Sequence, residues 1–302
     1  MRVTVTGASG LIGRALIKSL LSGGHSVVAL VRDPERVGKG LGSAEIAQWN
    51  PMIGAPPLSA LNGVDAVVHL AGEPVAENRW TASRKALIRD SRVIGTHNLV
   101  NGMRSASKPP GVLLSGSAIG YYGSRGDELL DEQSSNGSDF LANVCAEWEM
   151  EAAASRQLGT RVVTLRTGIV LANDGGALPM IVKPFHYFAG GPLGDGRQWM
   201  SWIHIADQVG LMRHALENAE ITGPLNLTAP EPVRNAVFAS TLGSVLGRPS
   251  LLPAPRFALG IFLGERVDVL VGSQKVLPQV AQRSGYVFRY PELRLALRYL
   301  LD

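Results

Sequence analysis

Short apolar and β-branched runs alternate with longer stretches of helical periodicity through the first 170 residues. The short runs predict strands at residues 2–6, 26–31, 44–48, 65–70, 111–115 and 161–166. The stretches between them predict helices at residues 11–21, 80–105 and 139–157. Continuously apolar strands separated by helices are typical of a parallel sheet that is covered on both faces. The pattern therefore predicts an α/β fold with a doubly wound parallel sheet over residues 1–170.

Beyond residue 170 the pattern loosens into connections rich in Gly and Pro, with helices predicted at residues 205–217, 233–246 and 292–301. We expect residues 171–302 to form a smaller C-terminal lobe that binds the substrate, and segments near 198–228 to complete the sheet. The apolar run at 257–263 is shorter than the roughly 18 residues that a membrane helix needs. No membrane segment is therefore predicted.

The composition of the chain excludes several classes of binding partner. Of the 302 residues, 45% are hydrophobic and 35 are Gly, which excludes a disordered chain and favours many tight turns. The net charge is only +4 and the sequence has no basic run, so neither nucleic acid nor a membrane surface is an expected partner. The single Cys145 and the scattered His residues have no metal-ligand spacing, and no metal is expected. The chain opens on a strand and a turn, which predicts a cytoplasmic protein.

A glycine-rich segment, residues 6–13 (TGASGLIG), directly follows the first strand and opens the first helix. A dinucleotide pyrophosphate binds at such a turn, where backbone amides meet the positive end of the helix. Gly7 permits the sharp turn, Gly10 lets the phosphates approach, and Gly13 lets the helix pack on the strand. The amides of Leu11 and Ile12 are the expected phosphate donors. An ordinary strand-to-helix turn is the alternative.

The second strand ends at Val31 and Arg32, where a NAD-selective site usually places Asp or Glu on the ribose 2′-hydroxyl. A guanidinium at this position can form paired hydrogen bonds with a 2′-phosphate and stack on adenine. NADP(H) is therefore the predicted cofactor, with the Ser9 hydroxyl as a second donor to the phosphate. Asp33 follows directly and could turn toward the ribose. A solvated Arg at the end of a strand is the other alternative.

These residues resemble the extended short-chain dehydrogenase/reductase superfamily, whose TGxxGxxG motif is matched by residues 6–13. The segment 65–72 (DAVVHLAG) is similar to the DxVxHLA segment of that superfamily. Several later stretches resemble one branch of it, the epimerase-family proteins with a small C-terminal domain of unknown function: residues 80–96, 115–123, 194–207 and 288–291. The resemblance implies a Rossmann-like sheet, a nicotinamide cofactor, and a loop beneath the cofactor ribose at Leu70, Ala71 and Gly72.

Three further cofactor contacts follow from the resemblance. Arg92 occupies the place of Asn in an NVxGT pattern, on a helix that faces the cofactor cleft in the superfamily. The alternative for Arg92 is a surface ion pair with Asp90 or Glu77. Ser115 ends the fifth predicted strand. Gly168 follows the sixth, where the family places backbone against the nicotinamide carboxamide.

Reductases and epimerases of this superfamily use a Ser or Thr to polarise the substrate carbonyl and a Tyr as acid/base. A Lys four residues after the Tyr makes the phenol effective by favouring its charged form. Ser117 matches the family Ser, with a turn-capping role as the alternative. Tyr121 and Tyr122 follow it closely and are the candidate catalytic acids, unless they only pack at a loop corner.

The Tyr–Lys pair itself is absent from the sequence. None of the six Tyr residues has a Lys four places later. Within the helix predicted at 139–157, Leu141 and Cys145 fall at the Tyr and Lys positions, and Glu149 lies one turn further along the same face. Cys145 could act as a thiolate, or be a small buried apolar residue.

Residues 194–207 resemble the GxGxQxRDFVHVDD stretch of sugar-nucleotide epimerases, in which the Arg binds the ligand pyrophosphate. In this chain that position is Met200, with Arg197 three residues earlier as a substitute cation. Trp199 and Trp202 suggest a partly apolar substrate pocket, or else aromatic packing between the lobes.

Two functions of different classes remain open from the sequence. One is an NADP(H)-dependent oxidoreductase or epimerase-like enzyme that acts on a small, partly apolar carbonyl or alcohol, with Ser117 as hydrogen-bond donor. The other is a non-catalytic NADP(H)-binding sensor or interaction protein, and a nucleotide-sugar epimerase comes third. The helices at 80–105 and 139–157 could form the dimer face common in the superfamily, so a homodimer also stays open.

Overall fold

The computed structural model describes residues 1–76, 78–255, 257, 260, 264–267 and 271–302. A parallel sheet of seven strands forms its centre, in the order β11-β7-β5-β4-β1-β2-β3. The strands are β1 (Arg2–Thr6), β2 (Ser26–Val31), β3 (Glu45–Gln48), β4 (Ala66–His69), β5 (Val112–Ala118), β7 (Arg161–Thr167) and β11 (Gly223–Leu227). Neighbouring strands all pair in parallel. This is a Rossmann-like doubly wound sheet, and the predicted fold class is confirmed. The strand order reverses at β1, the point where ligands bind in such sheets.

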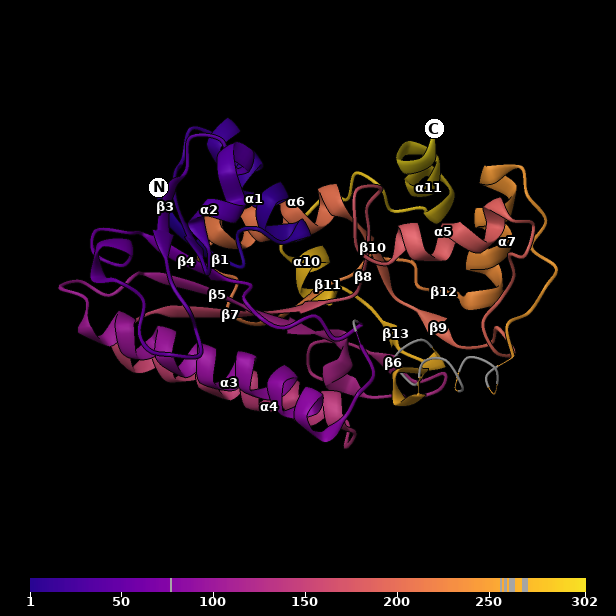
Figure 1. The fold of residues 1–302 in the computed structure, drawn as a ribbon, viewed down its shortest axis with the longest axis horizontal. Helices are drawn as coiled ribbons and strands as arrows, with labels where there is room; N and C mark the ends of the chain where they lie inside the picture. The colour runs from indigo at the N-terminus through magenta and orange to yellow at the C-terminus, as the bar shows by residue number, and fades with distance from the viewer. Residues whose placement is uncertain (77, 256, 258–259, 261–263, 268–270) are drawn as a thin grey trace.

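Helices cover both faces of the sheet. Figure 1 shows α3 (Ala82–Ser105) and α4 (Phe140–Ala153) side by side on one face, with α1 (Leu11–Ser22) and α6 (Ile205–Glu217) on the other. Each pair contributes an apolar stripe to its own core. The core beneath α1 and α6 includes Leu16, Leu20 and Met212, and the core beneath α3 includes Leu99 and Met103. These two cores fix the sheet, and with it the carboxyl ends of the strands.

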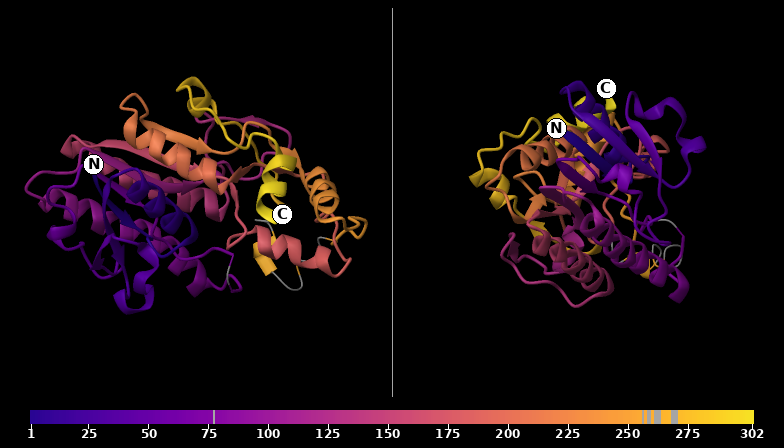
Figure 2. Two further views of the ribbon diagram at one scale, coloured as in Figure 1. Left: turned by 90° about the horizontal axis from the view of Figure 1, so that it is seen from above. Right: turned by 90° about the vertical axis from the view of Figure 1, so that its left-hand side faces the viewer.

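The C-terminal lobe has a core of its own. It is built around α5 (Leu178–His186), α7 (Asn235–Leu246) and α11 (Leu293–Leu301), which lie at the right of Figure 1. Trp202, Phe238 and Leu297 fill the space between them. Figure 2 shows the lobe beside the sheet along the long axis of the molecule. The lobe therefore stands beyond the carboxyl ends of the strands.

Three short strand pairs lie outside the central sheet. These pairs are β8 (Ile169–Leu171) with β10 (Trp202–His204), β9 (Trp199–Met200) with β12 (Val233–Arg234), and β6 (Leu129–Leu130) with β13 (Lys275–Val276). The remaining elements whose bounds are described are short helices: α2 (Pro34–Val37), α10 (Gln279–Arg283), and the 3₁₀ helices η1 (Gly38–Leu41), η2 (Leu58–Ala60), η3 (Ile119–Tyr122), η4 (Ala154–Leu158) and η5 (Gly264–Arg266). Among the described helices, none is long and apolar enough to cross a membrane.

Two strands depart from the sequence expectation. The fifth strand does not stop at Ser115 but runs to Ala118, because the last three residues of β5 pair with β7. Within residues 198–228, β11 joins the main sheet beside β7, whereas β9 and β10 pair with strands outside it. The longer β5 carries Ser117 inside a strand instead of on the turn that follows.

Asp207 ties the end of the chain to the sheet domain. It lies fully buried in the first turn of α6. Its carboxylate accepts hydrogen bonds from Tyr286 Oη at 3.1 Å, from the Arg289 amide at 2.8 Å and from the Tyr290 amide at 2.9 Å. A buried carboxylate is stable only when its oxygens are paired in this way. The contact fixes residues 286–290, a strap that leads into α11, and so positions the C-terminal lobe.

Candidate functional site

Two of the three glycines in the turn between β1 and α1 have no room for a side chain. Gly7 has φ +64°, a conformation that favours glycine, and a Cβ there would lie 2.7 Å from the Leu70 carbonyl carbon. A Cβ on Gly13 would lie 2.3 Å from the Gly7 carbonyl oxygen, whereas one on Gly10 would meet only that oxygen, at 3.2 Å. No side chain caps α1, and its first turn holds no acidic residue. The amides of this turn are therefore open to an anion.

A chain of hydrogen bonds fixes the loop that follows β4. The Thr6 hydroxyl lies 2.8 Å from His69 Nδ1 and accepts from the amides of Leu70 and Ala71, both at 3.1 Å. On its other side, His69 Nε2 lies 3.1 Å from the Thr96 hydroxyl, which donates to the Arg92 carbonyl oxygen. Burial, aided by the charge of nearby Arg92, lowers the pKa of His69 to about 3. A neutral imidazole with one donor and one acceptor completes this chain.

Arg92 points inward and does not form the surface ion pair that was the alternative. Its guanidinium donates to the carbonyl oxygens of Glu73 and Ile88, both at 3.0 Å, and lies 5.2 Å from the centre of the Trp148 ring. Asp90 pairs with Arg89 instead, at 3.0 Å. Glu77, the other partner considered, lies outside the described residues.

Arg32 stands at the end of β2 with most of its side chain in solvent. The side chain is 69% exposed, and Nη1 donates to Glu73 Oε1 at 2.9 Å. Asp33 turns back and accepts from the amides of Glu35 and Arg36, so it caps the turn of α2. Glu73 had no signal in the sequence, because it approaches Arg32 from the loop after β4.

Ser117 belongs to a buried charged network. Its hydroxyl donates to Glu149 Oε1 at 2.7 Å. The Arg166 guanidinium forms a bidentate pair with the same carboxylate, with hydrogen bonds from Nε to Oε1 at 2.8 Å and from Nη2 to Oε2 at 2.9 Å. Burial opposes the charge on Arg166, but the hydrogen bonds and charge of Glu149 outweigh burial and raise its pKa. Because the one hydroxyl proton goes to Glu149, Ser117 cannot also donate to a substrate carbonyl, the role predicted from sequence.

The two tyrosines have different surroundings. Tyr122 is fully buried, and its hydroxyl donates to Asn226 Oδ1 at 2.7 Å and accepts from Arg166 Nη1 at 3.1 Å. Burial raises the pKa of Tyr122 to about 12. Tyr121 is half-buried, with the Arg166 guanidinium 3.5 Å from the centre of its ring. Within the described ranges, no hydrogen bond to the Tyr121 hydroxyl is found. Tyr122 is committed to the interior, and Tyr121 retains a hydroxyl for a ligand.

The positions of the missing Tyr–Lys pair lie on α4 beside Ser117. Leu141 lies next to Gly120, and Cys145 is buried one turn further along the helix. Burial raises the pKa of the Cys145 thiol to about 11, against the opposing effect of the Arg92 charge. Cys145 is therefore a neutral thiol near neutral pH and not the thiolate considered as an alternative. The rest of this face is covered by Trp148, which leaves no space for a Cβ on Gly116.

Ser115 and Gly168, which were predicted to contact the cofactor, are both closely surrounded by protein. The Ser115 side chain is fully buried, and its hydroxyl lies 3.4 Å from the Gly116 carbonyl oxygen, so it does not face the cleft. Gly168 donates its amide to the Leu227 carbonyl oxygen at 3.0 Å. A Cβ at Gly168 would lie 2.5 Å from the Ser201 carbonyl oxygen. Glycine at this position lets β7 and β10 approach each other.

The residues that suggested an aromatic pocket pack against protein. Met200 and Trp202 belong to the core of the C-terminal lobe, and Met200 Sδ accepts from Asn235 at 3.0 Å. Trp199 lies between the cations of Arg234 and Lys275, each 4.4 Å from its ring. Arg197 and Arg234 line a nearby cavity of about 700 Å³, together with Gly126, Asp127, Gly194, Asp195, Gln198, Pro255, Val271 and Ser273.

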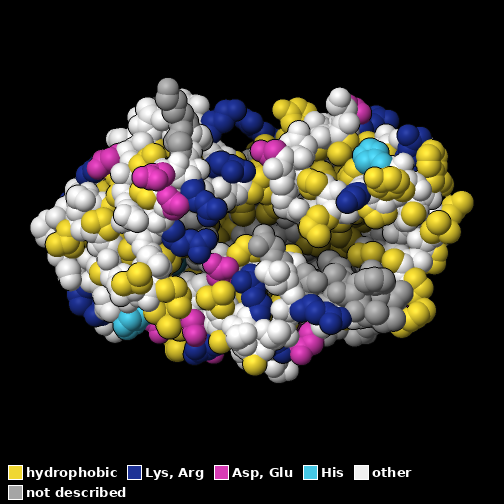
Figure 3. Space-filling model, viewed as in Figure 1, with side chains coloured by type: hydrophobic (Ala, Val, Ile, Leu, Met, Phe, Trp, Pro, Cys, Tyr) yellow, Lys and Arg dark blue, Asp and Glu magenta, His cyan; other side chains and the backbone are white. Residues whose placement is uncertain are grey.

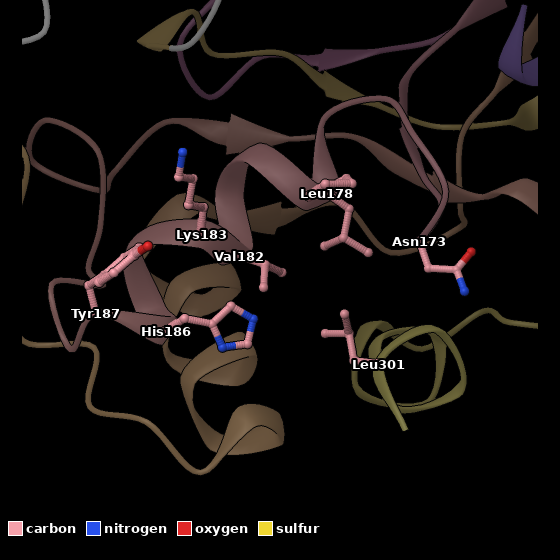
Figure 4. A pocket seen from close by; sticks show the side chains of 8 residues that line it. Asn173, Leu178, Val182, Lys183, His186, Tyr187 and Leu301 are labelled. Atoms are coloured by element: carbon pink, nitrogen blue, oxygen red, sulfur yellow. The ribbon is translucent and has the colours of Figure 1, made fainter.

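Figure 3 shows a hollow between the two lobes, with Lys and Arg side chains along its left margin and hydrophobic side chains inside it. A larger groove of about 1160 Å³ runs beside α1, where Leu11 and Arg14 line it, and reaches Arg289. Figure 4 shows a separate pocket of about 400 Å³, with Val182 and Leu301 from α5 and α11 facing each other across it. None of the predicted catalytic residues lines it. In the part of the chain that is described, no group of three His, Cys, Asp or Glu residues could hold a metal ion.

Comparisons with known proteins agree with this geometry. Residues 3–227 match the NAD dependent epimerase/dehydratase family, and residues 254–300 match a domain of unknown function (DUF1731). The chain is 42% identical to the chloroplastic epimerase family protein SDR39U1 homolog of Arabidopsis thaliana, over 100% of this chain and 87% of the relative. It is 36% identical to the epimerase family protein YfhF of Bacillus subtilis, over 100% and 98%.

Solved structures give the same result. The human epimerase family protein SDR39U1 (isoform 2), solved with NADPH, superposes with a TM-score of 0.89 at 34% identity, covering 99% of each chain. A nucleoside-diphosphate sugar epimerase from Corynebacterium glutamicum superposes with a TM-score of 0.79 at 36% identity, over 100% of this chain and 58% of the other.

Proposed function

Because this chain belongs to the NAD dependent epimerase/dehydratase family, we propose that it is an NADP(H)-dependent oxidoreductase acting on a small, partly apolar carbonyl or alcohol. One observation carries the proposal. The open glycine turn after β1, the guanidinium of Arg32 after β2, and the pair Ser117 and Tyr121 at the end of β5 all lie along one carboxyl edge of the sheet. In doubly wound sheets, cofactor and substrate meet at this edge.

The residues present fit NADP(H). The uncapped amides of Leu11 and Ile12 suit the pyrophosphate, since they lie at the positive end of a helix of 12 residues. The free donors of Arg32 suit the 2′-phosphate, and the exposed Ser9 hydroxyl, in the glycine turn after β1, is the second donor we propose. When bound, the cofactor supplies hydride transfer.

The loop after β4 completes the cofactor site on the ribose side. The hydrogen bonds that Thr6 accepts from Leu70 and Ala71 hold the loop, and Gly72 continues it beside Arg92. Gly168 directly follows β7, at the end of the site where we expect the nicotinamide. Arg92 supports the loop through the Glu73 carbonyl oxygen.

Two residues of this chain, Ser117 and Tyr121, form hydrogen bonds of opposite direction to the substrate oxygen. Ser117 gives its proton to Glu149, so it presents lone pairs and accepts a hydrogen bond from an alcohol. Tyr121 has a hydroxyl to donate to the same oxygen when it is a carbonyl. The ion pair of Glu149 with Arg166 fixes the orientation of Ser117, and the stacked Arg166 fixes the Tyr121 ring. Hydrophobic side chains in the hollow favour a partly apolar substrate.

To test the proposal, the protein is mixed with NADPH and, in turn, with several fractions, each a pool of small carbonyl compounds. Oxidation of NADPH is followed by absorbance. Tyr121→Phe should lower the rate of this oxidation by about ten- to a thousandfold, because it removes the hydrogen bond that Tyr121 donates to the carbonyl oxygen. Ser117→Ala should lower the reverse reaction, reduction of NADP⁺ by the corresponding alcohol, by a similar factor, because Ser117 accepts a hydrogen bond from the alcohol. NADPH affinity, measured by fluorescence, should stay nearly unchanged in both variants. Tyr187→Phe, which alters a tyrosine that is 74% exposed on the far lobe, is the control and should match wild type. Equal turnover in all four proteins would contradict the assignment.

One observation favours the second candidate, a non-catalytic NADP(H)-binding sensor. The acid/base positions on α4 hold Leu141 and a buried Cys145, neither of which transfers a proton near neutral pH. This candidate predicts tight NADPH binding with no oxidation by any fraction. The same experiment therefore separates the two.

A further inference from the structure

Glu73 is fixed at the end of β2 although it comes from the loop after β4. Its amide donates to the Ser91 hydroxyl at 3.1 Å, and its carbonyl oxygen accepts from Arg92 Nη1 at 3.0 Å. The carboxylate then reaches two guanidinium groups, Arg32 through Oε1 at 2.9 Å and Arg84 through Oε2 at 3.2 Å. With backbone and both oxygens bonded, the carboxylate cannot turn away from Arg32.

Positively charged groups surround Glu73, and some of their hydrogen-bond donors have no partner among the described residues. Three guanidinium groups, those of Arg32, Arg84 and Arg92, donate to Glu73, and within the described ranges no second carboxylate is found bonded to any of them. Arg84 Nε is buried without a hydrogen-bond partner, and the Arg32 side chain is 69% exposed. The cluster can therefore take a further anion, but its most accessible cation is already shared with a carboxylate.

We propose that Glu73 sets the cofactor preference by limiting how strongly the site favours NADP(H) over NAD(H). The inference rests on the proposed function, since it concerns the same 2′-phosphate position. A phosphate that binds Arg32 must share that guanidinium with the Glu73 carboxylate and is repelled by it. A ribose 2′-hydroxyl is neutral, suffers no such repulsion, and can donate a hydrogen bond to a carboxylate.

Glu73 has two opposing effects on NADP(H). It orients Arg32, which favours the phosphate, and it carries a like charge, which disfavours it. An ion pair with an arginine that is mostly exposed contributes little. Repulsion between a carboxylate and a phosphate of nearly two negative charges acts over several ångströms even in a high dielectric. The repulsion is the larger effect, so removing the charge should strengthen NADP(H) binding.

The experiment is a fluorescence titration of Glu73→Gln with NADPH and with NADH at low ionic strength. The NADPH dissociation constant should fall about three- to tenfold, whereas NADH binding should be unchanged or weaker. Combining Glu73→Gln with Arg32→Ala should abolish the gain. Glu45→Gln is the matched control, because Glu45 forms a similar 3.0 Å pair with Arg2 at the amino end of the sheet and should change neither affinity.

Unchanged or weaker NADPH binding in Glu73→Gln would overturn the inference, as would an equal shift for both cofactors, which would indicate a structural role only. If Glu73→Gln does not fold, Glu73→Ala carries the same test. A wild type that binds NADPH but is insensitive to Glu73 refutes this inference alone. A wild type that binds neither cofactor refutes the proposed function.

Discussion

At the scale of single residues, buried polar groups near the carboxyl edge are held in one protonation state by their partners. His69 accepts at Nδ1 and donates at Nε2, and the flanking Thr6 and Thr96 hydroxyls fit only that arrangement. A second proton on the ring would leave Thr6 without an acceptor and would bury a charge. His204 is also buried: its Nδ1 accepts from the Ala206 amide at 3.0 Å, and burial lowers its pKa to about 4.

These histidines predict an acid-sensitive fold. The pKa of His69 is about 3 when folded and near 6.5 when unfolded, so the unfolded chain binds an extra proton between these values. The stability from keeping His69 neutral is complete above about pH 6.5 and is lost as the pH falls toward 3. Urea unfolding at several pH values between 7 and 4 should show this decline. His69→Asn should make it shallower by about one proton, whereas His186→Asn, at an exposed site, should leave the slope as it is. Equal slopes in all three proteins would contradict the interpretation.

At the scale of elements, the local pattern of apolar residues was sufficient to predict the bounds of strands and helices that pack in the core of the sheet. β1 and β2 match the predicted bounds, and α1 runs one residue further. α5 could not be predicted, because Pro179 and Pro184 break the helical pattern, and packing of Leu178 and Phe185 in the second core stabilises it instead. The continuation of β5 was also missed, since the sequence from Gly116 resembles a turn and only pairing with β7 makes it a strand.

In the site, too, local features could be predicted from the sequence, whereas contacts that depend on long-range strand pairing could not. The glycine turn is local and could be found from residues 6–13, and the position of Glu149 on the Cys145 face follows from helical periodicity. The pairing of Glu149 with Arg166 depends on β7 lying next to β5, which no local pattern specifies. Glu73 meets Arg32 for a similar reason, because β2 and β4 flank β1 from opposite sides.

The junction of β1 and α1 yields a prediction at this scale. Gly13→Ala should lower the free energy of unfolding by about 1–3 kcal/mol and weaken NADPH binding, because the new Cβ would overlap the Gly7 carbonyl oxygen. Chemical denaturation and fluorescence titration measure the two effects. Gly54→Ala is the control, since nothing lies within 4 Å of a Cβ there, and it should stay within about 0.5 kcal/mol of wild type. If both variants behave alike, the junction is looser than its geometry indicates.

At the scale of the whole molecule, the family resemblance is confirmed over nearly the full chain. The C-terminal lobe uses for packing several residues that the sequence offered as ligand contacts. Met200 and Trp202 lie in its core, and Asp207 anchors the strap into α11. We therefore expect the cations of Arg197 and Arg234, which line a cavity of about 700 Å³, to be the groups of this segment that remain open to a ligand.

This division of roles predicts weak binding of nucleotide sugars. Where sugar-nucleotide epimerases place an Arg on the pyrophosphate, this chain has Met200, only 7% exposed and hydrogen-bonded to Asn235. Loss of one charge-assisted hydrogen bond costs about 1.5–3 kcal/mol, or about ten- to a hundredfold in affinity. Calorimetry with UDP-glucose in the presence of NADPH should show at most weak binding. Arg197 is the exposed cation closest in sequence, so Arg197→Ala is the informative variant. Micromolar binding by wild type that is lost in Arg197→Ala would mean that Arg197 has taken over the pyrophosphate, and that the substrate is a nucleotide sugar after all.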